Sequence, residues 1–134
     1  MDKKWLVAII DDELDIVNLF REALHNIKGV TIFTFTDATV ALEHFRFNNS
    51  AYVLVISDLR MPHINGLDLV YEVKKINPSV RTLLMTAFEV NDNLFQEYIK
   101  NRVINGFLQK PIKLGELRRE VIKQINIFRK SKTR

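Results

Sequence analysis

Carboxylates directly follow two apolar runs of this sequence, and carboxylates in such places can hold a metal ion or act as nucleophiles. The run WLVAII, residues 5–10, leads into Asp11 and Asp12, and the run YVLVIS, residues 52–57, leads into Asp58. Each acid also has a plain structural interpretation. Asp11 or Asp12 can interact with the amino end of a following helix, and Asp58 can simply occupy a turn.

A hydroxyl group and an ammonium group follow two further apolar runs. Thr86 ends RTLLMT, residues 81–86, and Lys110 stands shortly after VINGFL, residues 103–108, and just before Pro111. Taken singly, Thr86 is most simply a strand residue, and a lysine before a proline is unremarkable. If these runs are strands of one parallel sheet, however, all of these polar groups meet at the carboxyl edge of that sheet.

Such a cluster suits phosphoryl chemistry. Carboxylates held close together repel one another, and a hard cation such as Mg²⁺, which prefers oxygen ligands, relieves that repulsion. Asp58 is then predicted to be a nucleophile that forms an aspartyl phosphate, with Lys110 and Thr86 as donors to the phosphoryl oxygens. The three histidines lie in separate segments without ligand spacing, which argues against zinc.

The elements that must position these groups alternate between strands and helices. The four runs above, together with VTIFTF at 30–35, predict five strands buried in a sheet. Apolar residues at helical spacing predict helices over 14–27, from Asp37 through Phe45, from Gly66 to 77, from 91 or 92 through Ile99, and over 113–129. This alternation predicts an α/β fold with a doubly wound parallel sheet.

Length and composition favour a single compact domain inside the cell. The chain has 134 residues, of which 47% are hydrophobic and 27% are charged, as in ordinary globular proteins. Its first apolar run is too short for a signal peptide or a membrane span, and cysteine is absent. We therefore expect a cytoplasmic protein that makes no contact with a membrane.

Positive charge is concentrated near the end of the sequence. Residues 110–134 carry nine Lys or Arg and two Glu, a net charge of +7, whereas residues 1–109 carry eleven against fourteen acids, a net charge of −3. The basic segment is most simply a solvated helix face, although it can also contact nucleic acid or an acidic partner. Residues 127–134 are expected to be a basic tail or the start of a linker.

Taken together, these motifs resemble the response-regulator receiver family over residues 4–126. The matching features are the acidic pair in IIDDE, the aspartate in SDLRMPHINGLDL, the threonine in MTA and the lysine-proline pair in GFLQKP, in the family's order and approximate spacing. The resemblance implies a receiver domain over 1–126 with a flavodoxin-like five-stranded sheet of order 2-1-3-4-5. It implies a phosphoprotein of two-component signalling, which catalyses only its own phosphorylation and dephosphorylation and is otherwise no enzyme.

The resemblance also implies a set of site residues. Asp58 would be the phosphoacceptor, and Mg²⁺ would be bound by Asp11, Asp12, Asp58 and the backbone carbonyl of Arg60. The phosphoryl donor would be a phosphohistidine on a sensor histidine kinase or a histidine phosphotransfer protein. The peptide bond before Pro111 is expected to be cis, which proline tolerates better than any other residue.

The resemblance also implies a surface that switches between two states. Thr86 and Phe107 match the family's switch positions, and the backbone of Ala87 would contact the phosphoryl group. The surface built from the fourth helix, fifth strand and fifth helix would then form a homodimer or dock a downstream protein. Phe95 and Tyr98 can supply apolar contacts there, although core packing also explains them, as it can explain Phe107.

Two positions depart from the family's commoner choices. Arg60 stands two residues after Asp58, and Phe88 stands two residues after Thr86. Both would flank the path by which water reaches an aspartyl phosphate. We hypothesise that their bulk, and the charge of Arg60, slow hydrolysis and make the phosphorylated form long-lived.

Rival interpretations of the same sequence differ in chemistry more than in fold. A flavodoxin-like redox protein would need a Ser, Thr and Gly-rich loop where this chain has Asp-Asp-Glu, and a dehalogenase-type phosphatase would need an acid where this chain has Arg60. A protein-binding module that works without phosphorylation stays open, as does the regulatory part of a longer DNA-binding regulator whose output domain is missing here. No helix-turn-helix pattern is present, so we expect no intrinsic sequence-specific DNA binding.

Overall fold

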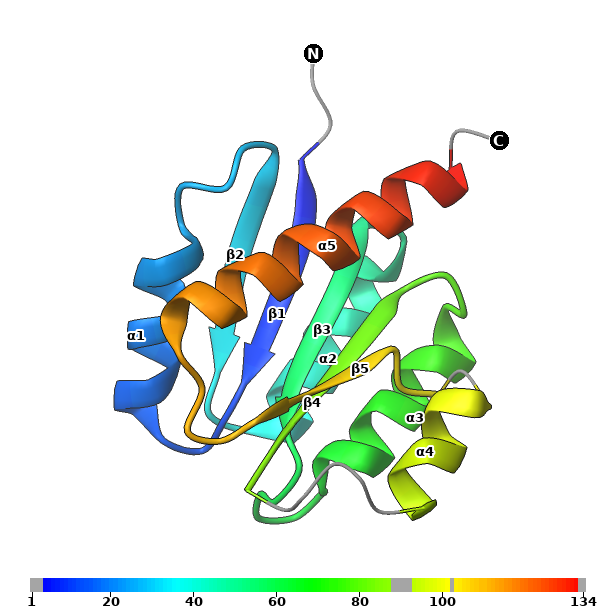
Figure 1. The fold of residues 1–134 in the computed structure, drawn as a ribbon. Coiled ribbons are helices and arrows are strands. Elements are labelled where there is room, and N and C mark those ends of the chain that lie inside the picture. The colour runs from blue at the N-terminus through cyan, green and yellow to red at the C-terminus, as the bar shows by residue number, and fades with distance from the viewer. Residues whose placement is uncertain (1–3, 88–92, 102, 133–134) are drawn as a thin grey trace.

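The chain forms one twisted parallel sheet with helices on both faces (Figure 1). The computed structural model describes residues 4–87, 93–101 and 103–132, without the side chains of residues 94, 95 and 98. Over these residues the sheet has five strands in the order β2-β1-β3-β4-β5, and all four neighbouring pairs are parallel. The predicted α/β fold and its strand order are therefore confirmed.

The strands are short and rich in apolar residues, as strands covered on both faces tend to be. The strands are β1 (Trp5–Ile10), β2 (Val30–Phe35), β3 (Tyr52–Asp58), β4 (Arg81–Thr86) and β5 (Gly106–Gln109). β3 lies at the centre of the sheet and is buried along its whole length, whereas the edge strand β2 is half-buried throughout. The central strand is thus the best protected from water, and it ends on Asp58.

Helices connect the strands in the described part of the chain. The helices are α1 (Leu14–Leu24), α2 (Ala38–Asn48), α3 (Gly66–Ile76), α4 (Asn93–Lys100) and α5 (Leu114–Lys132), with a 3₁₀ turn η1 (Asn49–Ala51) before β3. The Asp37 carboxylate accepts hydrogen bonds from the N–H groups of Thr39 and Val40 at 2.8 and 3.4 Å, and Asn65 Oδ1 accepts one from Asp68 at 2.8 Å. These side chains satisfy donors that the amino ends of α2 and α3 leave unpaired.

Side chains alternate across β1 and so contribute to two apolar cores, one on each face of the sheet. Val7 and Ile9 pack with residues of α1 and α5, while Ala8 and Ile10 pack with residues of α2 and α3. The helices therefore cover the sheet in pairs, α1 with α5 and α2 with α3 (Figure 1). This double cover holds the strand ends in fixed positions relative to one another.

The start of the fifth strand and the end of the first helix differ from the predicted bounds. The fifth strand begins at Gly106, three residues later than predicted, since Asn105 pairs with Thr82 through both its N–H group and its Oδ1 atom, each at 2.8 Å. The first helix ends at Leu24 rather than 27, where the N–H group of Ile27 closes a turn onto the Leu24 carbonyl at 3.1 Å.

The last helix is longer than predicted and reaches Lys132 rather than 129. Phe128 is buried in edge-to-face contact with Trp5 at a ring-centroid distance of 5.0 Å, and the Ser131 hydroxyl donates to the Phe128 carbonyl at 2.7 Å. These contacts stabilise the final turns of α5 against fraying. Although α5 is long, neither it nor any other helix of the described residues is apolar enough to cross a membrane.

Candidate functional site

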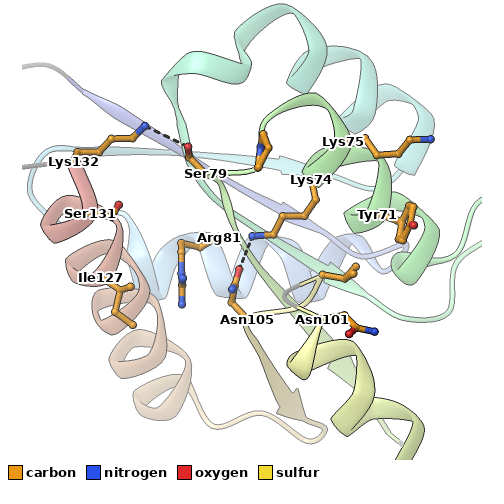
Figure 2. Close-up of a pocket in the computed structure, with 12 residues that line it drawn as sticks. Tyr71, Lys74, Lys75, Ser79, Arg81, Asn101, Asn105, Ile127, Ser131 and Lys132 are labelled. Carbon is orange, nitrogen blue, oxygen red and sulfur yellow. Dashed lines mark hydrogen bonds between the residues drawn. The ribbon is translucent and has the colours of Figure 1, made fainter. Parts of the chain in front are cut away.

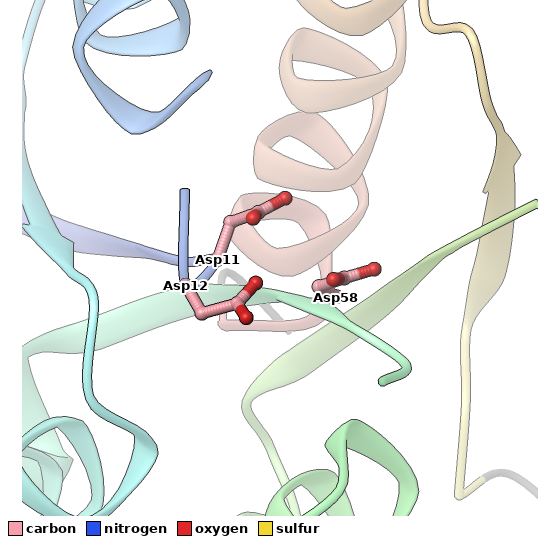
Figure 3. Close-up of side chains that lie close together, drawn as sticks. All are labelled: Asp11, Asp12 and Asp58. Atoms are coloured by element: carbon pink, nitrogen blue, oxygen red, sulfur yellow. The ribbon is translucent and has the colours of Figure 1, made fainter. Parts of the chain in front are cut away.

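Polar groups gather at one edge of the sheet, where the parallel strands have their carboxyl ends. Asp11 and Asp12 follow β1, Asp58 is the last residue of β3, Thr86 is the last residue of β4, and Lys110 follows β5. Figure 3 shows the three aspartate side chains converging from the ends of β1 and β3. The structure thus brings together residues that lie up to 99 positions apart in the sequence.

The three aspartates form a carboxylate cluster, defined as Asp11, Asp12 and Asp58. One carboxylate oxygen from each residue lies within 4.8 Å of the others. Asp11 is fully buried and Asp58 is 8% exposed, whereas Asp12 is open to solvent. Like charges at such separations repel one another, more strongly where water is excluded. A cation near the cluster would reduce this repulsion.

Lys110 supplies one such cation and bridges two members of the cluster. Its Nζ atom lies 3.1 Å from Asp58 Oδ1 and 3.2 Å from Asp11 Oδ2. The lysine backbone is held as well, because its N–H group donates to the Thr86 carbonyl at 2.7 Å and the following peptide bond to Pro111 is cis, as predicted. The ammonium group thereby links the ends of β1, β3 and β5.

The pKa values of the ion pair reflect both burial and charge. Burial raises the pKa of Asp58, the hydrogen bond and charge of Lys110 oppose this, and the charges of Asp11 and Asp12 add to the rise. Burial lowers the pKa of Lys110, but its contacts with Asp58 and Asp11 outweigh burial and raise it overall. The site therefore pairs a charged lysine with a carboxylate whose pKa is raised by burial.

Asp11 also helps to order the chain before α1. Its Oδ1 atom accepts the backbone N–H of Glu13 at 3.0 Å, while its Oδ2 atom contacts Lys110. Glu13 is the residue that precedes α1. This contact agrees with the interpretation of Asp11 as a residue that interacts with the start of a helix, and its role as a metal ligand stays a prediction.

A pocket of about 300 Å³ opens beside the phosphoacceptor candidate. It is lined by Asp58, Leu59, Arg60, Thr86, Ala87 and Lys110. Arg60 and Ala87 are exposed at this pocket, and Thr86 is 1% exposed. The structure thus places Arg60, Thr86 and Ala87 around the carboxylate that the sequence singled out.

Of the aromatic side chains singled out in the sequence, the structure describes that of Phe107. Phe107 is half-buried on β5 and packs against a small apolar cluster that contains Val70, Leu84 and Ile104. This location agrees with a core role, and its role as a switch stays a prediction. Phe88 lies outside the described residues, as do the side chains of residues 95 and 98.

Two contacts to the Asp58 backbone were missed by reasoning from the sequence. The Ser57 hydroxyl donates to the Asp58 carbonyl at 2.9 Å. Gly66 begins α3 so close to that carbonyl that an added Cβ would lie 2.0 Å from its oxygen, and its own N–H group donates to the Leu59 carbonyl at 2.8 Å. A glycine before a helical pattern is visible in the sequence, but its close approach to Asp58 is not.

The carboxylate cluster has the donor chemistry that Mg²⁺ prefers. All of its ligand atoms are carboxylate oxygens, two of the acids are shielded from water, and Asp12 leaves one side open for entry. With all groups ionised, three carboxylates and one ammonium group carry a net charge of −2, which a divalent cation balances. The residues present therefore fit a magnesium ion.

Comparison with known proteins gives relatives over most of the chain. Residues 7–122 match the family model described as the response regulator receiver domain. The chain is 28% identical over 114 residues to the DNA-binding transcriptional regulator NtrC of Escherichia coli, and 31% identical over 110 residues to the response regulator protein PilR of Pseudomonas aeruginosa. These alignments cover 85% and 82% of this chain but 23% and 24% of those proteins, so the chain spans about a quarter of their length.

Solved structures show the same architecture. A response regulator receiver domain protein from Clostridium thermocellum is 27% identical to this chain and superposes with a TM-score of 0.81 over 97% of this chain and 99% of that one. The family match covers all three residues of the carboxylate cluster and Lys110. The chain belongs to the response-regulator receiver family, whose members are signalling phosphoacceptors rather than conventional enzymes.

Proposed function

We propose that this receiver domain accepts a phosphoryl group on Asp58 from a phosphohistidine. The donor would be a sensor histidine kinase or a histidine phosphotransfer protein. The observation that supports this best is the position of the Asp58 carboxylate, which borders an open pocket while lying 3.1 Å from the Lys110 ammonium group and within the carboxylate cluster. A residue that merely formed a turn would need none of these partners.

The proposed transfer exchanges one bond for another at phosphorus. A carboxylate oxygen of Asp58 forms the new P–O bond while the N–P bond of the phosphohistidine breaks. The electron pair of that bond stays on the imidazole nitrogen, and a proton, already on the ring or taken from water, leaves the imidazole neutral. Later attack of water on phosphorus breaks the P–O bond, releases inorganic phosphate and restores the Asp58 carboxylate.

Lys110, Thr86 and the backbone N–H group of Ala87 are proposed to donate hydrogen bonds to the phosphoryl oxygens. All three residues line the same pocket as Asp58. Donors that are already in position stabilise the charge on these oxygens without reorganisation during the transfer. Lys110 would pass from the Asp58 carboxylate to the phosphoryl group that replaces its negative charge.

Asp11, Asp12, Asp58 and the backbone carbonyl of Arg60 are proposed to hold Mg²⁺. The ion, when bound, neutralises charge on the phosphoryl group. The chain's own contribution is to hold two of these carboxylates out of water on adjacent strands, so that they are in place before the donor arrives.

Phosphorylation is proposed to change the surface formed by α4, β5 and α5. Thr86 and Phe107 lie on paired strands, with Leu84 opposite Phe107 and Thr86 opposite Gln109. The Thr86 hydroxyl would turn toward the phosphoryl group, and the Phe107 ring would move inward into the space that the hydroxyl leaves. The changed surface would then form a homodimer or dock a downstream protein.

A second candidate function concerns a longer protein. NtrC is named as a DNA-binding transcriptional regulator, and the chain matches about a quarter of its length. We propose residues 1–126 as the receiver domain and 127–134 as a basic tail or the start of a linker, although 127–132 continue α5. On this view the receiver is the regulatory part of a DNA-binding regulator, and this chain alone would not bind DNA sequence-specifically.

The acceptor role is tested by incubating the chain with Mg²⁺ and a small acyl phosphate and measuring its intact mass. The wild type and the exposed control Asp15→Asn are expected to gain one phosphoryl group, and Asp58→Asn is expected to gain none. A gain in Asp58→Asn would place the acceptor elsewhere. No gain in the wild type would favour a binding module that works without phosphorylation.

A further inference from the structure

A second cavity lies at the opposite edge of the sheet from Asp58. Its volume is about 790 Å³, and it is bordered by the end of α3, the start of β4 and the end of α5 (Figure 2). Arg81 lines this cavity, and Thr86 lines the pocket beside Asp58, called the phosphoryl pocket from here on. The two sites are therefore separated by the length of β4, roughly 16 Å. The cavity is therefore distinct from the carboxylate cluster.

Basic side chains line this cavity, and none of its described lining residues is acidic. Lys74 and Lys75 come from α3, Arg81 from β4 and Lys132 from the end of α5. Figure 2 shows Lys74 and Arg81 near the middle and Lys132 at one side, with Tyr71 at the other side. A concave surface lined by charges of one sign concentrates the field and attracts the opposite charge.

Lys74 is the basic group most clearly held in place. Its Nζ atom donates to Asn105 Oδ1 at 2.9 Å, and the same oxygen accepts the backbone N–H of Thr82 at 2.8 Å. An ammonium group has three N–H donors, and among the described residues no carboxylate lies within 4.0 Å of this one. Burial, with a smaller effect from the charge of Arg81, lowers the pKa of Lys74 to about 8. An anion in the cavity would accept hydrogen bonds from the remaining N–H groups of Lys74 and would stabilise its charged form.

Arg81 and Lys132 also lack ion pairs within the described residues. Arg81 Nε donates to Gln124 Oε1 at 2.7 Å, and Lys132 Nζ lies 3.4 Å from Ser79 Oγ. Glu120 acts on Arg81 through its charge but does not line the cavity. Lys75, by contrast, pairs with Glu72 at 3.6 Å. The charges of Lys74, Arg81 and Lys132 are thus held by neutral hydrogen-bond acceptors among the described residues.

We propose that this cavity binds a small phosphate-bearing anion of nucleotide size. Its volume falls in the range of roughly 300 to 1,000 Å³ that small-molecule pockets occupy, which is more than a single phosphate group needs. Phosphate oxygens would accept charge-assisted hydrogen bonds from Lys74, Arg81 and Lys132. The Tyr71 ring, which lines the same cavity, offers a flat apolar face for a planar base.

The ligand class is tested by calorimetric titration of the full chain at low salt with EDTA, which keeps metal out of the carboxylate cluster. ADP and pyrophosphate are expected to bind, adenosine is not, and added salt is expected to weaken binding. Tighter binding of ADP than of pyrophosphate would assign a nucleotide, and equal affinities would assign the phosphate groups alone. Absence of binding by both anions would overturn the proposal.

Variants locate the binding site. Lys74→Met and Lys132→Gln are each expected to weaken ADP binding about tenfold, the loss of one charge-assisted hydrogen bond. Lys28→Gln, which removes an exposed lysine outside the cavity, is expected to leave the affinity unchanged. Asp58→Asn is also expected to bind ADP normally, which separates this proposal from the phosphoacceptor function.

Stability of the variants does not decide the outcome, because Lys132 is exposed near the end of α5 and its replacement leaves the core intact. If Lys74→Met fails to fold, Lys132→Gln alone carries the comparison. Unchanged ADP affinity in every folded cavity variant, or equal weakening in Lys28→Gln, would overturn the assignment to this cavity.

Discussion

Lys110 is shared between two carboxylates, and this sharing limits what the site can do before a phosphoryl group arrives. One ammonium group lies 3.1 Å from Asp58 and 3.2 Å from Asp11, while Asp12 is left to solvent. The repulsion that remains can be relieved by a divalent cation or by protonation of an acid. Cation binding and phosphoryl acceptance are therefore expected to depend on the same three carboxylates.

Addition of Mg²⁺ is expected to stabilise the chain, and EDTA is expected to reverse the effect. At a Mg²⁺ concentration ten times the dissociation constant, the gain in free energy of unfolding would be about 1.4 kcal/mol. Asp12→Asn should reduce this gain, whereas Glu13→Gln, which changes the neighbouring exposed acid, should retain it. Thermal unfolding followed by circular dichroism measures the difference, and an equal Mg²⁺ response in wild type and Asp12→Asn would contradict the metal assignment.

Arg60 stands at the opening of the phosphoryl pocket, where it is exposed. If it restricts the approach of water, Arg60→Ala should lose the aspartyl phosphate about fivefold faster, which corresponds to ~1 kcal/mol of barrier. Phe88→Ala, chosen from the sequence alone, should act in the same direction, and the exposed α2 variant Arg46→Ala should not. Decay of the phosphorylated mass after removal of the donor measures the lifetime. An unchanged lifetime in both site variants would end this hypothesis.

The connection from β3 to α3 holds the backbone of Leu59, the residue after Asp58, through both its N–H group and its carbonyl group. The N–H group of Leu59 donates to the Met85 carbonyl on β4 at 2.9 Å, and the N–H group of Gly66 donates to the Leu59 carbonyl at 2.8 Å. The loop thus returns to the strand end, and α3 begins beside the Asp58 carbonyl. This arrangement fixes the position of the carboxylate without any contact to the carboxylate itself.

Gly66→Ala should disturb this connection severely, since its Cβ would lie 2.0 Å from the Asp58 carbonyl oxygen. Relief requires a backbone shift, and we expect a loss of about 2 to 3 kcal/mol in the free energy of unfolding, together with slower phosphorylation. Gly115→Ala is the matched control, because its nearest contact is 3.4 Å away, to the flexible Arg119 side chain. Urea unfolding compares the two, and equal stabilities would show that α3 can move away from Asp58 freely.

The strand β4 connects both proposed sites and gives the domain a path between them. Its first residue, Arg81, lines the basic cavity, and its last residue, Thr86, lines the phosphoryl pocket. β5 runs beside it, and Phe107 is paired with Leu84 in the middle of β4. A change at Thr86 is therefore expected to reach β5 and α5 through this strand pair.

Phosphorylation of the wild type should alter hydrogen exchange over 106–109 and 114–132, the described strand and helix of the proposed output surface. Thr86→Ala should accept the phosphoryl group but show a smaller change in exchange, because the hydroxyl that links phosphate to the surface is lost. Thr39→Ala, an exposed threonine on α2, serves as the control. The switch role of Thr86 would be wrong if Thr86→Ala responded like the wild type.

The order of strands and helices and the acids at the strand ends could be read from the sequence. Periodicity of apolar residues is a local property, and parallel strands necessarily bring their carboxyl ends to one edge, so Asp58 and Lys110 could be placed together in advance. The start of β5 could not be predicted in this way, because it depends on hydrogen bonds between Asn105 and Thr82, which is 23 residues away.

The basic cavity and the close approach of Gly66 emerged only from the folded chain. Lys74, Arg81 and Lys132 each look like ordinary surface charges in the sequence, since they belong to three separate elements. Packing decides which of these charges lose water and which face one another, because desolvation depends on neighbours from distant segments. Local patterns therefore determine the fold and the residue types at the strand ends, and tertiary packing determines the distances, burial and electrostatics.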